Sequence, residues 1–283
     1  MAGGHGTRLG PITKVVTKQL IPVYDKPMIF YPLATLLLAG IREILIISKP
    51  IDVSFFRSLF GNGKDLGIDI SYEIQERPNG IAEAFIIGEK FINSSPSALI
   101  LGDNLFHGNG LSKSLQRISS NSRGATIFGY QVKDPQRYGI VEFNKENKAI
   151  SIEEKPNLPK SKYAVTGLYF YDETACEKSR TITPSKRGEL EITELNNLYL
   201  KDSNLNVELL GRGMVWLDTG TTDTLHEASS YVRTIEHRQG LKIGAPEEIA
   251  WRLGFINDAQ LEKNASKYLK STYGEYLMKL LDK

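Results

Sequence analysis

The stretch from residue 2 to residue 27, AGGHGTRLGPITKVVTKQLIPVYDKP, is the part of the chain from which the fold is best interpreted. Its apolar residues do not recur at helical or strand spacing for long, so core packing alone does not explain it. Its glycines allow tight turns that present main-chain N–H groups to an anion, and Arg8 and Lys18 add positive charge. The simplest ligand for such a loop is a polyphosphate.

Two common phosphate-binding loops do not fit this stretch. A Walker loop requires a Gly-Lys-Ser/Thr sequence at a spacing that is not present here. The dinucleotide fingerprint G-x-G-x-x-G fits Gly4 and Gly6 and then fails, because Leu9 stands where the third glycine belongs. The plain alternative is a glycine-rich surface turn.

A longer pattern favours phosphate binding over that alternative. The sequence fits GGxGTRLxPxTxxxxKxLxPVxxKPM, which resembles the N-terminal signature of the sugar-nucleotide pyrophosphorylases. The resemblance extends over essentially the whole chain. By resemblance the loop residues that bind the nucleotide are Gly3, Gly4, Gly6, Thr7, Arg8 and Gln19. We expect His5, where the family commonly has serine, to lie beside the phosphates.

Composition narrows the class of protein. The 283 residues are 41% hydrophobic and 24% charged, which is ordinary for a globular protein. A net charge of +2 argues against a nucleic-acid-binding surface, and no apolar run approaches the ~20 residues that a membrane-spanning helix needs. The single cysteine, Cys176, rules out an internal disulfide. With no secretory segment at the N-terminus, we expect a cytoplasmic protein.

Periodicity predicts alternating helices and strands in the first half of the chain. Helices are expected over residues 28–39, 54–60 and 80–92, and strands over residues 43–48, 68–74 and 98–101. This alternation predicts parallel βαβ units, with binding groups at the carboxyl ends of the strands. We therefore expect an α/β fold, with a Rossmann-like mixed, largely parallel sheet flanked by helices.

The second half is richer in strands. Strands are expected over residues 125–132, 138–143, 149–153, 163–171, 205–210 and 214–217, and helices over residues 189–201 and 223–237 and from 247 onward. We interpret residues 1–239 as one nucleotidyltransferase α/β domain. Its nucleotide-binding part is 1–123 and its sugar-binding part is 124–239. Residues 240–283 form a helical appendage.

Two aspartates follow predicted strands and could meet at one crevice. Asp103 comes just after the strand at 98–101, and Asp218 follows the apolar run at 214–217. Taken singly, an aspartate after a strand is more often a turn or N-cap residue. A pair of carboxylates suits Mg²⁺, which completes its octahedron with phosphate and water. Both positions match the metal-binding aspartates of the resembled family, so we expect Mg²⁺ as the cofactor.

The remaining site residues are implied by the resemblance. The segment 75–84, QERPNGIAEA, corresponds to the base-binding loop, with Gln75 and Gly80 retained and Glu83 among the departures. An amide pairs well with a base because it can both donate and accept. The sugar-phosphate contacts implied by resemblance are Asn104, Gly139, Glu154, Lys155, Val165 and Arg187.

The reaction that the resemblance implies is transfer of a thymidylyl group from dTTP to glucose 1-phosphate, with release of pyrophosphate. No side-chain nucleophile is required, so catalysis is positioning and charge neutralisation by Arg8, Lys18 and Lys155. The alternatives are a uridylyltransferase or another sugar-1-phosphate nucleotidyltransferase, and a non-catalytic sugar-nucleotide-binding regulatory protein. The resemblance also implies a homotetramer.

One departure from the resembled pattern concerns the first strand. Family members have an apolar strand directly before the AGG sequence, where this sequence has Met1. We therefore expect the first strand of the sheet to be missing from this sequence, as in a truncated or mis-started reading. About four buried aliphatic residues, at ~1.5–3 kcal/mol each, would be absent with it.

Overall fold

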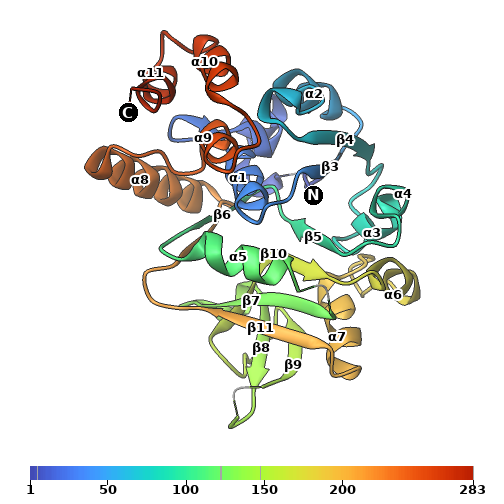
Figure 1. The fold of residues 1–283 in the computed structure, drawn as a ribbon. Helices are drawn as coiled ribbons and strands as arrows, with labels where there is room; N and C mark the ends of the chain where they lie inside the picture. The colour runs from blue at the N-terminus through green and yellow to red at the C-terminus, as the bar shows by residue number, and fades with distance from the viewer. Residues whose placement is uncertain (5, 122, 147, 283) are drawn as a thin grey trace.

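The computed structural model describes residues 1–4, 6–121, 123–146 and 148–282, and it confirms an α/β fold (Figure 1). The helices are α1 (Phe30–Leu38), α2 (Val53–Phe60), α3 (Glu83–Ile87), α4 (Glu89–Ile92), α5 (Leu111–Ser119), α6 (Ala175–Thr181), α7 (Ile192–Lys201), α8 (Thr222–Gln239), α9 (Pro246–Arg252), α10 (Asp258–Ser266) and α11 (Thr272–Lys279). Single 3-10 turns are η1 (Thr7–Leu9), η2 (Ile12–Lys14), η3 (Lys18–Leu20), η4 (Lys64–Leu66) and η5 (Pro135–Arg137).

The strands form a central mixed sheet and three two-stranded pairs. They are β1 (Pro22–Val23), β2 (Lys26–Pro27), β3 (Glu43–Ser48), β4 (Asp69–Ile74), β5 (Ser97–Ile100), β6 (Asn104–His107), β7 (Ala125–Gln131), β8 (Gly139–Phe143), β9 (Ala149–Glu154), β10 (Tyr163–Tyr171), β11 (Leu205–Leu210) and β12 (Val215–Asp218). The central sheet has the order β11-β7-β10-β8-β9, with β5 also on β10. The pairs β3–β4 and β7–β11 are parallel, and β6–β12 is antiparallel.

Most of the predicted elements are confirmed, several of them to the residue. Glu43–Ser48, Tyr163–Tyr171 and Leu205–Leu210 are strands with the predicted bounds. The first two are rich in β-branched or aromatic residues, which pack well on a pleated surface. The helix predicted at 28–39 is α1, and the chain turns at Gly40 with φ of 83°.

The helix predicted over 80–92 is wrong in its extent. Its first residues are not helical, because Gly80 has φ of 110° and the Ala82 N–H bonds to the carbonyl of Leu190. The remainder breaks at Gly88 into α3 and α4, where a Cβ would lie 2.9 Å from the Ala84 carbonyl oxygen. The helix predicted from 189 begins only at Ile192 for the same reason, since Leu190 is held in an extended pairing with the 79–82 segment.

Separate apolar clusters pack on the two sides of the molecule. In Figure 1 the α1–β3–β4 region and the C-terminal helices lie above, and β7, β8, β9 and β11 form the lower sheet with α7 against it. The helices α9–α11 share a core with α1 and β3, in which Leu37, Phe56, Leu261 and Leu277 are fully buried. The C-terminal helices therefore cover the side of the β3–β4 pair rather than standing apart.

No helix in the described ranges has both the length and the apolar character that crossing a membrane requires.

Candidate active site

Asp103 and Asp218 are brought together by the pairing of β6 with β12. Asp218 lies opposite Asn104 in the antiparallel register, so Asp103 is at the adjoining end of the pair. Thr219 holds the segment after β12 against Asp103, because both its N–H (3.1 Å) and its hydroxyl (2.8 Å) donate to the Asp103 main-chain carbonyl. Two aspartates that are 115 residues apart in the chain therefore share one corner of the sheet, as the sequence predicted.

Lys18 reaches this corner from the glycine-rich loop. It is in η3, its side chain is only 6% exposed, and its Nζ forms an ion pair with Asp103 Oδ2. The other oxygen of Asp103 accepts a hydrogen bond from the Asn104 amide at 2.9 Å. The ion pair offsets part of the cost of burying the Lys18 ammonium, and it fixes the direction in which Asp103 points.

The charge of Asp218 is less well neutralised by its surroundings than that of Asp103, which is paired with Lys18. Burial and the nearby charge of Asp103 raise its pKa above the usual value, although Lys18, Arg8 and Arg137 act in the opposite direction. Crowding of two acids in this way favours the binding of a divalent cation between them.

The Arg8 guanidinium and the Asp218 carboxylate both lie beside Gly220. A Cβ at Gly220 would lie 2.8 Å from Arg8 Nη2 and 3.0 Å from Asp218 Oδ1. The missing side chain of Gly220 thus leaves room for the exposed guanidinium of Arg8 to lie across the segment that follows β12. The geometry gathers Arg8, Lys18 and the two aspartates, which is the charge arrangement for holding a polyphosphate with a metal ion.

The donor set fits Mg²⁺. In the described part of the chain, no group of three or more His, Cys, Asp or Glu residues is placed to hold a metal. A pair of aspartates leaves the other coordination positions to water and substrate oxygens, and Mg²⁺ characteristically binds through one or two carboxylates plus phosphates. Zinc, which is normally held by three or four protein ligands, does not suit this pair.

The glycine-rich loop wraps around Lys18. Gly6 has φ of 61°, and a Cβ there would lie 2.8 Å from Thr13 Cγ2 and 3.2 Å from Lys18 Cβ. Gly4 is exposed, with nothing within 4 Å of the position of a Cβ. Thr7 begins η1, the turn that carries Arg8. His5 lies outside the described residues.

Gln19 and Gly3 are packed rather than open. Gln19 is 3% exposed, and its side chain lies against Gly102, where a Cβ would be 2.9 Å from Gln19 Cγ. Gly3 lies against Gln75, because a Cβ on Gly3 would be 2.6 Å from Gln75 Oε1. The loop therefore contacts both the Asp103 turn and the predicted base-binding segment.

Gln75 is held with a fixed amide orientation. Its Nε2 donates to the Gly80 carbonyl at 3.2 Å and to Glu83 Oε2 at 2.7 Å, so its Oε1 faces the Gly3 main chain. Glu83 also accepts from Asn79 at 2.8 Å. The glutamate that departs from the family pattern thus orients the glutamine that is retained.

The predicted sugar-phosphate residues gather on β8, β9 and the segment before α7. Gly139 lies opposite Glu154, and a Cβ on Gly139 would be 3.2 Å from Glu154 Oε2 and 4.0 Å from Val165 Cβ. Glu154 accepts a hydrogen bond from Thr193 at 2.7 Å. Its other oxygen lies 3.3 Å from Lys155 Nζ.

Lys155 and Arg187 supply positive charge on this side. Lys155 has φ of 45°, an uncommon conformation for a residue other than glycine, and its side chain is 47% exposed. Arg187 lies 2.8 Å from Glu191 and 3.5 Å from Glu154. Strain concentrates at functional positions in proteins, and the backbone of Lys155 turns its ammonium back over Glu154.

Asn104 is engaged on both sides of its amide. It is 3% exposed, its Nδ2 donates to Asp103, and its Oδ1 accepts from the Gly167 N–H at 3.1 Å and from Trp216 Nε1 at 2.5 Å. These contacts tie Asp103 to β10 and β12. The structure thus surrounds Asn104 with protein partners.

Tyr138 and Tyr169 lie between the residues around Asp103 and Asp218 and those around Glu154 and Lys155. The Lys155 N–H donates to the Tyr138 carbonyl at 3.0 Å, and the Tyr138 side chain lies in the field of Asp218 and Arg8. Burial raises the pKa of Tyr169, and the charges of Glu154 and Asp103 raise it further, which puts both acids near one tyrosine. The acids of the two halves of the predicted site therefore lie on the same part of the molecule, around Tyr169.

The sequence did not reveal three residues that lie beside the acids of this site. Arg137 contributes positive charge at Asp218, Tyr138 adjoins the same carboxylate, and Thr193 positions Glu154. The first two stand directly before Gly139 and the third stands six residues after Arg187, so all three are close in sequence to residues that the resemblance had implied. What the sequence could not show was which side chains of those segments turn toward the acids.

Comparison with known proteins agrees with this geometry. The nucleotidyl transferase family model matches residues 1–234. A glucose-1-phosphate thymidylyltransferase of Neisseria meningitidis is 55% identical over 283 residues, 100% of this chain and 98% of the relative. The enzyme of the same name from Mycolicibacterium smegmatis is 57% identical with the same coverage.

Solved structures give the same result. A candidate glucose-1-phosphate thymidylyltransferase from Bacillus anthracis, crystallised with sucrose, has a TM-score of 0.76 and 38% identity, covering 82% of this chain and 93% of its own. A UDP-glucose pyrophosphorylase bound to UDP-glucose has a TM-score of 0.73 at 24% identity, covering 83% of this chain and 97% of its own, which supports the fold. The chain belongs to the nucleotidyl transferase family.

Proposed function

We propose that this chain transfers a thymidylyl group from dTTP to glucose 1-phosphate, giving dTDP-glucose and pyrophosphate. The observation that carries the proposal is the meeting of Asp103 and Asp218 beside Lys18 and Arg8. The names of the relatives at 52–57% identity support the choice of substrates. A non-catalytic sugar-nucleotide-binding protein would have no need of the acid pair.

The residues of the loop hold the triphosphate in this proposal. Arg8 is exposed beside Asp218, so its guanidinium can reach the β- and γ-phosphates and neutralise the charge that develops on the leaving pyrophosphate. The N–H groups around Gly4 and Gly6 add hydrogen-bond donors to the same anion. Lys18 forms an ion pair with Asp103 and orients its carboxylate.

Asp103 and Asp218 would hold Mg²⁺. When bound, the ion supplies positive charge to the nucleotide phosphates and lowers the repulsion between the two anionic substrates.

Residues of β8, β9 and the segment before α7 would hold the sugar phosphate so that its oxygen can attack the α-phosphorus of dTTP in line. Lys155 would hold its phosphate, and Glu154, oriented by Thr193, would accept hydrogen bonds from the sugar hydroxyls. Gly139 and Val165 leave room for the ring, and Arg187 would add a further phosphate contact. Asn104 is proposed to act on the sugar phosphate through Asp103, which it positions. No covalent intermediate is needed, since orienting two substrates can by itself contribute ~7–11 kcal/mol.

Gln75 shapes the base-binding segment in this proposal. It is buried, its Nε2 donates to Gly80 and Glu83, and its Oε1 faces the Gly3 main chain, so it fixes the position of the loop beside that segment. The choice of thymine as the base is supported by the names of the relatives.

Two further features are part of the proposal. Residues 1–123 and 124–239 would supply the nucleotide and sugar walls of one domain, with 240–283 as a helical appendage to it. The family resemblance supports a homotetramer, which sedimentation of the purified protein checks.

The deciding experiment measures pyrophosphate release with dTTP, UTP, CTP, ATP and GTP, each combined with glucose 1-phosphate or another hexose 1-phosphate, in magnesium buffer. We expect the highest kcat/KM with dTTP and glucose 1-phosphate. A higher kcat/KM with UTP would replace the base assignment, and no release from any pair would overturn the enzymatic function.

A further inference from the structure

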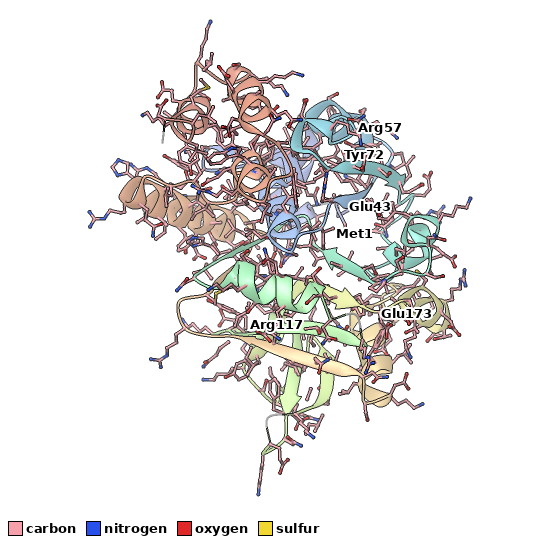
Figure 2. All side chains as sticks on the ribbon, viewed as in Figure 1. Met1, Glu43, Arg57, Tyr72, Arg117 and Glu173 are labelled. Carbon is pink, nitrogen blue, oxygen red and sulfur yellow. The ribbon has the colours of Figure 1, made fainter. Side chains whose placement is uncertain are left out.

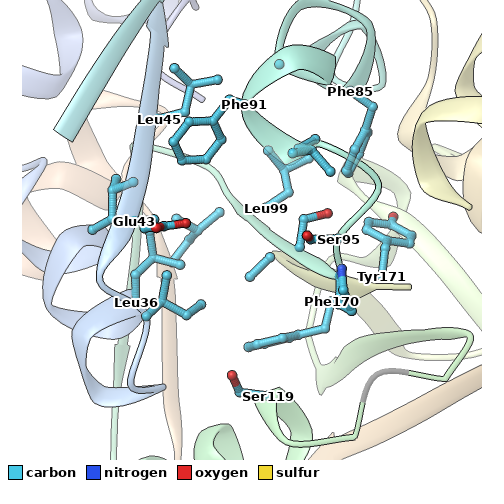
Figure 3. Close-up of a pocket in the computed structure, with 18 of the residues that line it drawn as sticks. Leu36, Glu43, Leu45, Phe85, Phe91, Ser95, Leu99, Ser119, Phe170 and Tyr171 are labelled. Carbon is cyan, nitrogen blue, oxygen red and sulfur yellow. The ribbon is translucent and has the colours of Figure 1, made fainter. Parts of the chain in front are cut away.

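The residues that follow β3 contact the glycine-rich loop. Figure 3 shows Glu43 and Leu45 of β3 on the wall of a cavity of about 600 Å³. The described residues that line this cavity do not include Asp52, which comes after β3. Asp52 is 4% exposed, and its carboxylate accepts a hydrogen bond from the hydroxyl of Thr17, the residue directly before Lys18. A buried side-chain contact therefore joins the end of β3 to the turn that carries Lys18.

Asp52 stands at the N-cap position of α2 without capping that helix. An aspartate in this position normally accepts a hydrogen bond from a main-chain N–H of the first turn, which stabilises a helix by ~0.5–2 kcal/mol. In the described part of the chain, the Asp52 side chain makes no such bond to α2. Its carboxylate instead accepts from the Thr17 hydroxyl at 2.9 Å and pairs with Lys49 Nζ at 3.2 Å. The side chain is thus engaged with the loop rather than with its own helix.

The helix α2 gives Asp52 a fixed position. Phe56 of α2 is fully buried in the cluster that also contains α1 and the C-terminal helices. Figure 2 labels Arg57 of α2 and Tyr72 of β4, and the guanidinium carbon lies 4.6 Å from the ring centroid. The Tyr72 hydroxyl also donates to the Gly61 carbonyl at 2.6 Å, just after α2. Because α2 is packed on β4 in this way, Asp52 presents its carboxylate from a rigid element.

Thr17 is the residue through which Asp52 holds the loop. It is 7% exposed, and its hydroxyl lies 2.9 Å from Asp52 Oδ2 and 3.3 Å from Gln19 Oε1. The hydroxyl has one proton, and the charged acceptor makes the stronger bond. The Thr17 carbonyl accepts from the Leu20 N–H at 3.0 Å, which closes η3. The residue bonded to Asp52 is therefore also the start of the turn that carries Lys18.

Lys18 depends on this turn for its direction. η3 has three residues, and the hydrogen bonds inside such a 3-10 turn are poorly aligned, so contacts outside the turn fix its orientation. One of these contacts is the bond from Thr17 to Asp52. Another is the packing of Lys18 against Gly6, where a Cβ would lie 3.2 Å from Lys18 Cβ. With both contacts in place, the ammonium of Lys18 is aligned with Asp103.

We propose that Thr17 and Asp52 are positioning residues of the reaction, which direct Lys18 toward Asp103. This inference rests on the proposed function for the role that it gives to Lys18. Neither residue touches a substrate, and both act through the Lys18 ammonium. Lys49 supports them from outside: its side chain is 23% exposed, and its charge offsets part of the cost of burying the Asp52 carboxylate.

The first test is Thr17→Val, which keeps the shape of the side chain and removes its hydroxyl. We expect kcat for pyrophosphate release from dTTP and glucose 1-phosphate to fall about 10–10²-fold, the cost of misplacing a catalytic group by ~1 Å. The KM for glucose 1-phosphate should stay within about twofold, because the sugar wall is untouched. Thr17→Ser keeps the hydroxyl and should restore kcat. Thr35→Val removes the hydroxyl of another buried threonine, which bonds within α1, and should leave kcat unchanged.

A double variant shows whether Thr17 acts through Lys18. Thr17→Val should cause no further loss of kcat in a protein that already carries Lys18→Gln, because two changes to one unit are not additive. Asp52→Ala should lower kcat as much as Thr17→Val, and the two together should be no worse than either. An additional loss of the full size in the Lys18→Gln background would overturn the positioning role, as would wild-type kcat in Thr17→Val.

Amide hydrogen exchange of Leu20 and Ile21 gives a readout that needs no turnover. Their N–H groups donate to the carbonyls of Thr17 and Lys18, so their exchange reports on η3. We expect exchange at both to be about tenfold faster in Thr17→Val and unchanged in Thr17→Ser. Unchanged exchange in Thr17→Val would contradict the inference. Faster exchange in a protein whose wild type releases no pyrophosphate would leave the hold on the turn intact and overturn the proposed function instead.

Discussion

Replacing Lys18 by glutamine is the change that bears most directly on how the acid pair is held. Lys18 is 6% exposed and forms an ion pair with Asp103, whose side chain is 20% exposed. Glutamine keeps most of the length and removes the charge. Asp103 and Asp218 would then face each other with one fewer buried cation.

The expected loss is large in rate and moderate in stability. Breaking a buried pair by removing one partner typically costs ~3–5 kcal/mol, and water reaching Asp103 will reduce that figure here. Removing a preorganised charge from a site that stabilises developing negative charge lowers kcat by about 10²–10³-fold. Since Lys18 is one of the groups that lower the pKa of Asp218, that pKa should rise further, and the acid limb of kcat/KM should move to higher pH.

The assay is pyrophosphate release from dTTP and glucose 1-phosphate across pH, with melting curves of the same samples. Lys14→Gln is the matched control, because Lys14 is in the same loop and is exposed. It should keep wild-type kcat and an unshifted profile. Equal kinetics of the two variants would refute the role given to Lys18.

Three further predictions follow from the site. Asp218→Asn should abolish turnover, yet raise the melting temperature in EDTA at pH 7. Burial and the charge of Asp103 raise the pKa of the Asp218 carboxyl in the folded protein, so its ionisation destabilises the fold increasingly as the pH rises above about 4. The increase in melting temperature should therefore vanish as the pH falls toward 4. Gly220→Ala should lower kcat about tenfold, because its Cβ would displace the guanidinium of Arg8. Thr193→Val should raise the KM for glucose 1-phosphate about tenfold, since Glu154 loses its 2.7 Å donor.

Matched variants separate these effects from general damage. Gly211→Ala adds a Cβ in open space and should leave kcat unchanged. Thr193→Ser keeps the hydroxyl and should restore the KM. A melting temperature for Asp218→Asn at or below that of the wild type in EDTA would contradict the crowding of the two acids.

The sequence predicted the structure best where the residues of a segment determine its secondary structure by themselves. β3 and β10 were predicted to the residue, because a run of β-branched or aromatic residues bounded by turns specifies a buried strand. The meeting of Asp103 and Asp218 was also predictable, since both follow apolar runs that end at one edge of a sheet.

Long-range pairing was not predictable in the same way. The helix at 80–92 is shortened by the pairing of Leu190 with the 79–82 segment, and nothing local to either segment reveals that contact. The position of Arg137 beside Asp218 likewise depends on how β8 packs against β10.

The central claim is that two aspartates and two loop cations assemble a magnesium-dependent site for joining dTTP to glucose 1-phosphate. It is tested most directly by titrating Mg²⁺ against pyrophosphate release for the wild type and for the double variant Asp103→Asn, Asp218→Asn. We predict saturable activation of the wild type and no activation of the double variant. Release that persists in EDTA, or equal activation of both proteins, would contradict the account.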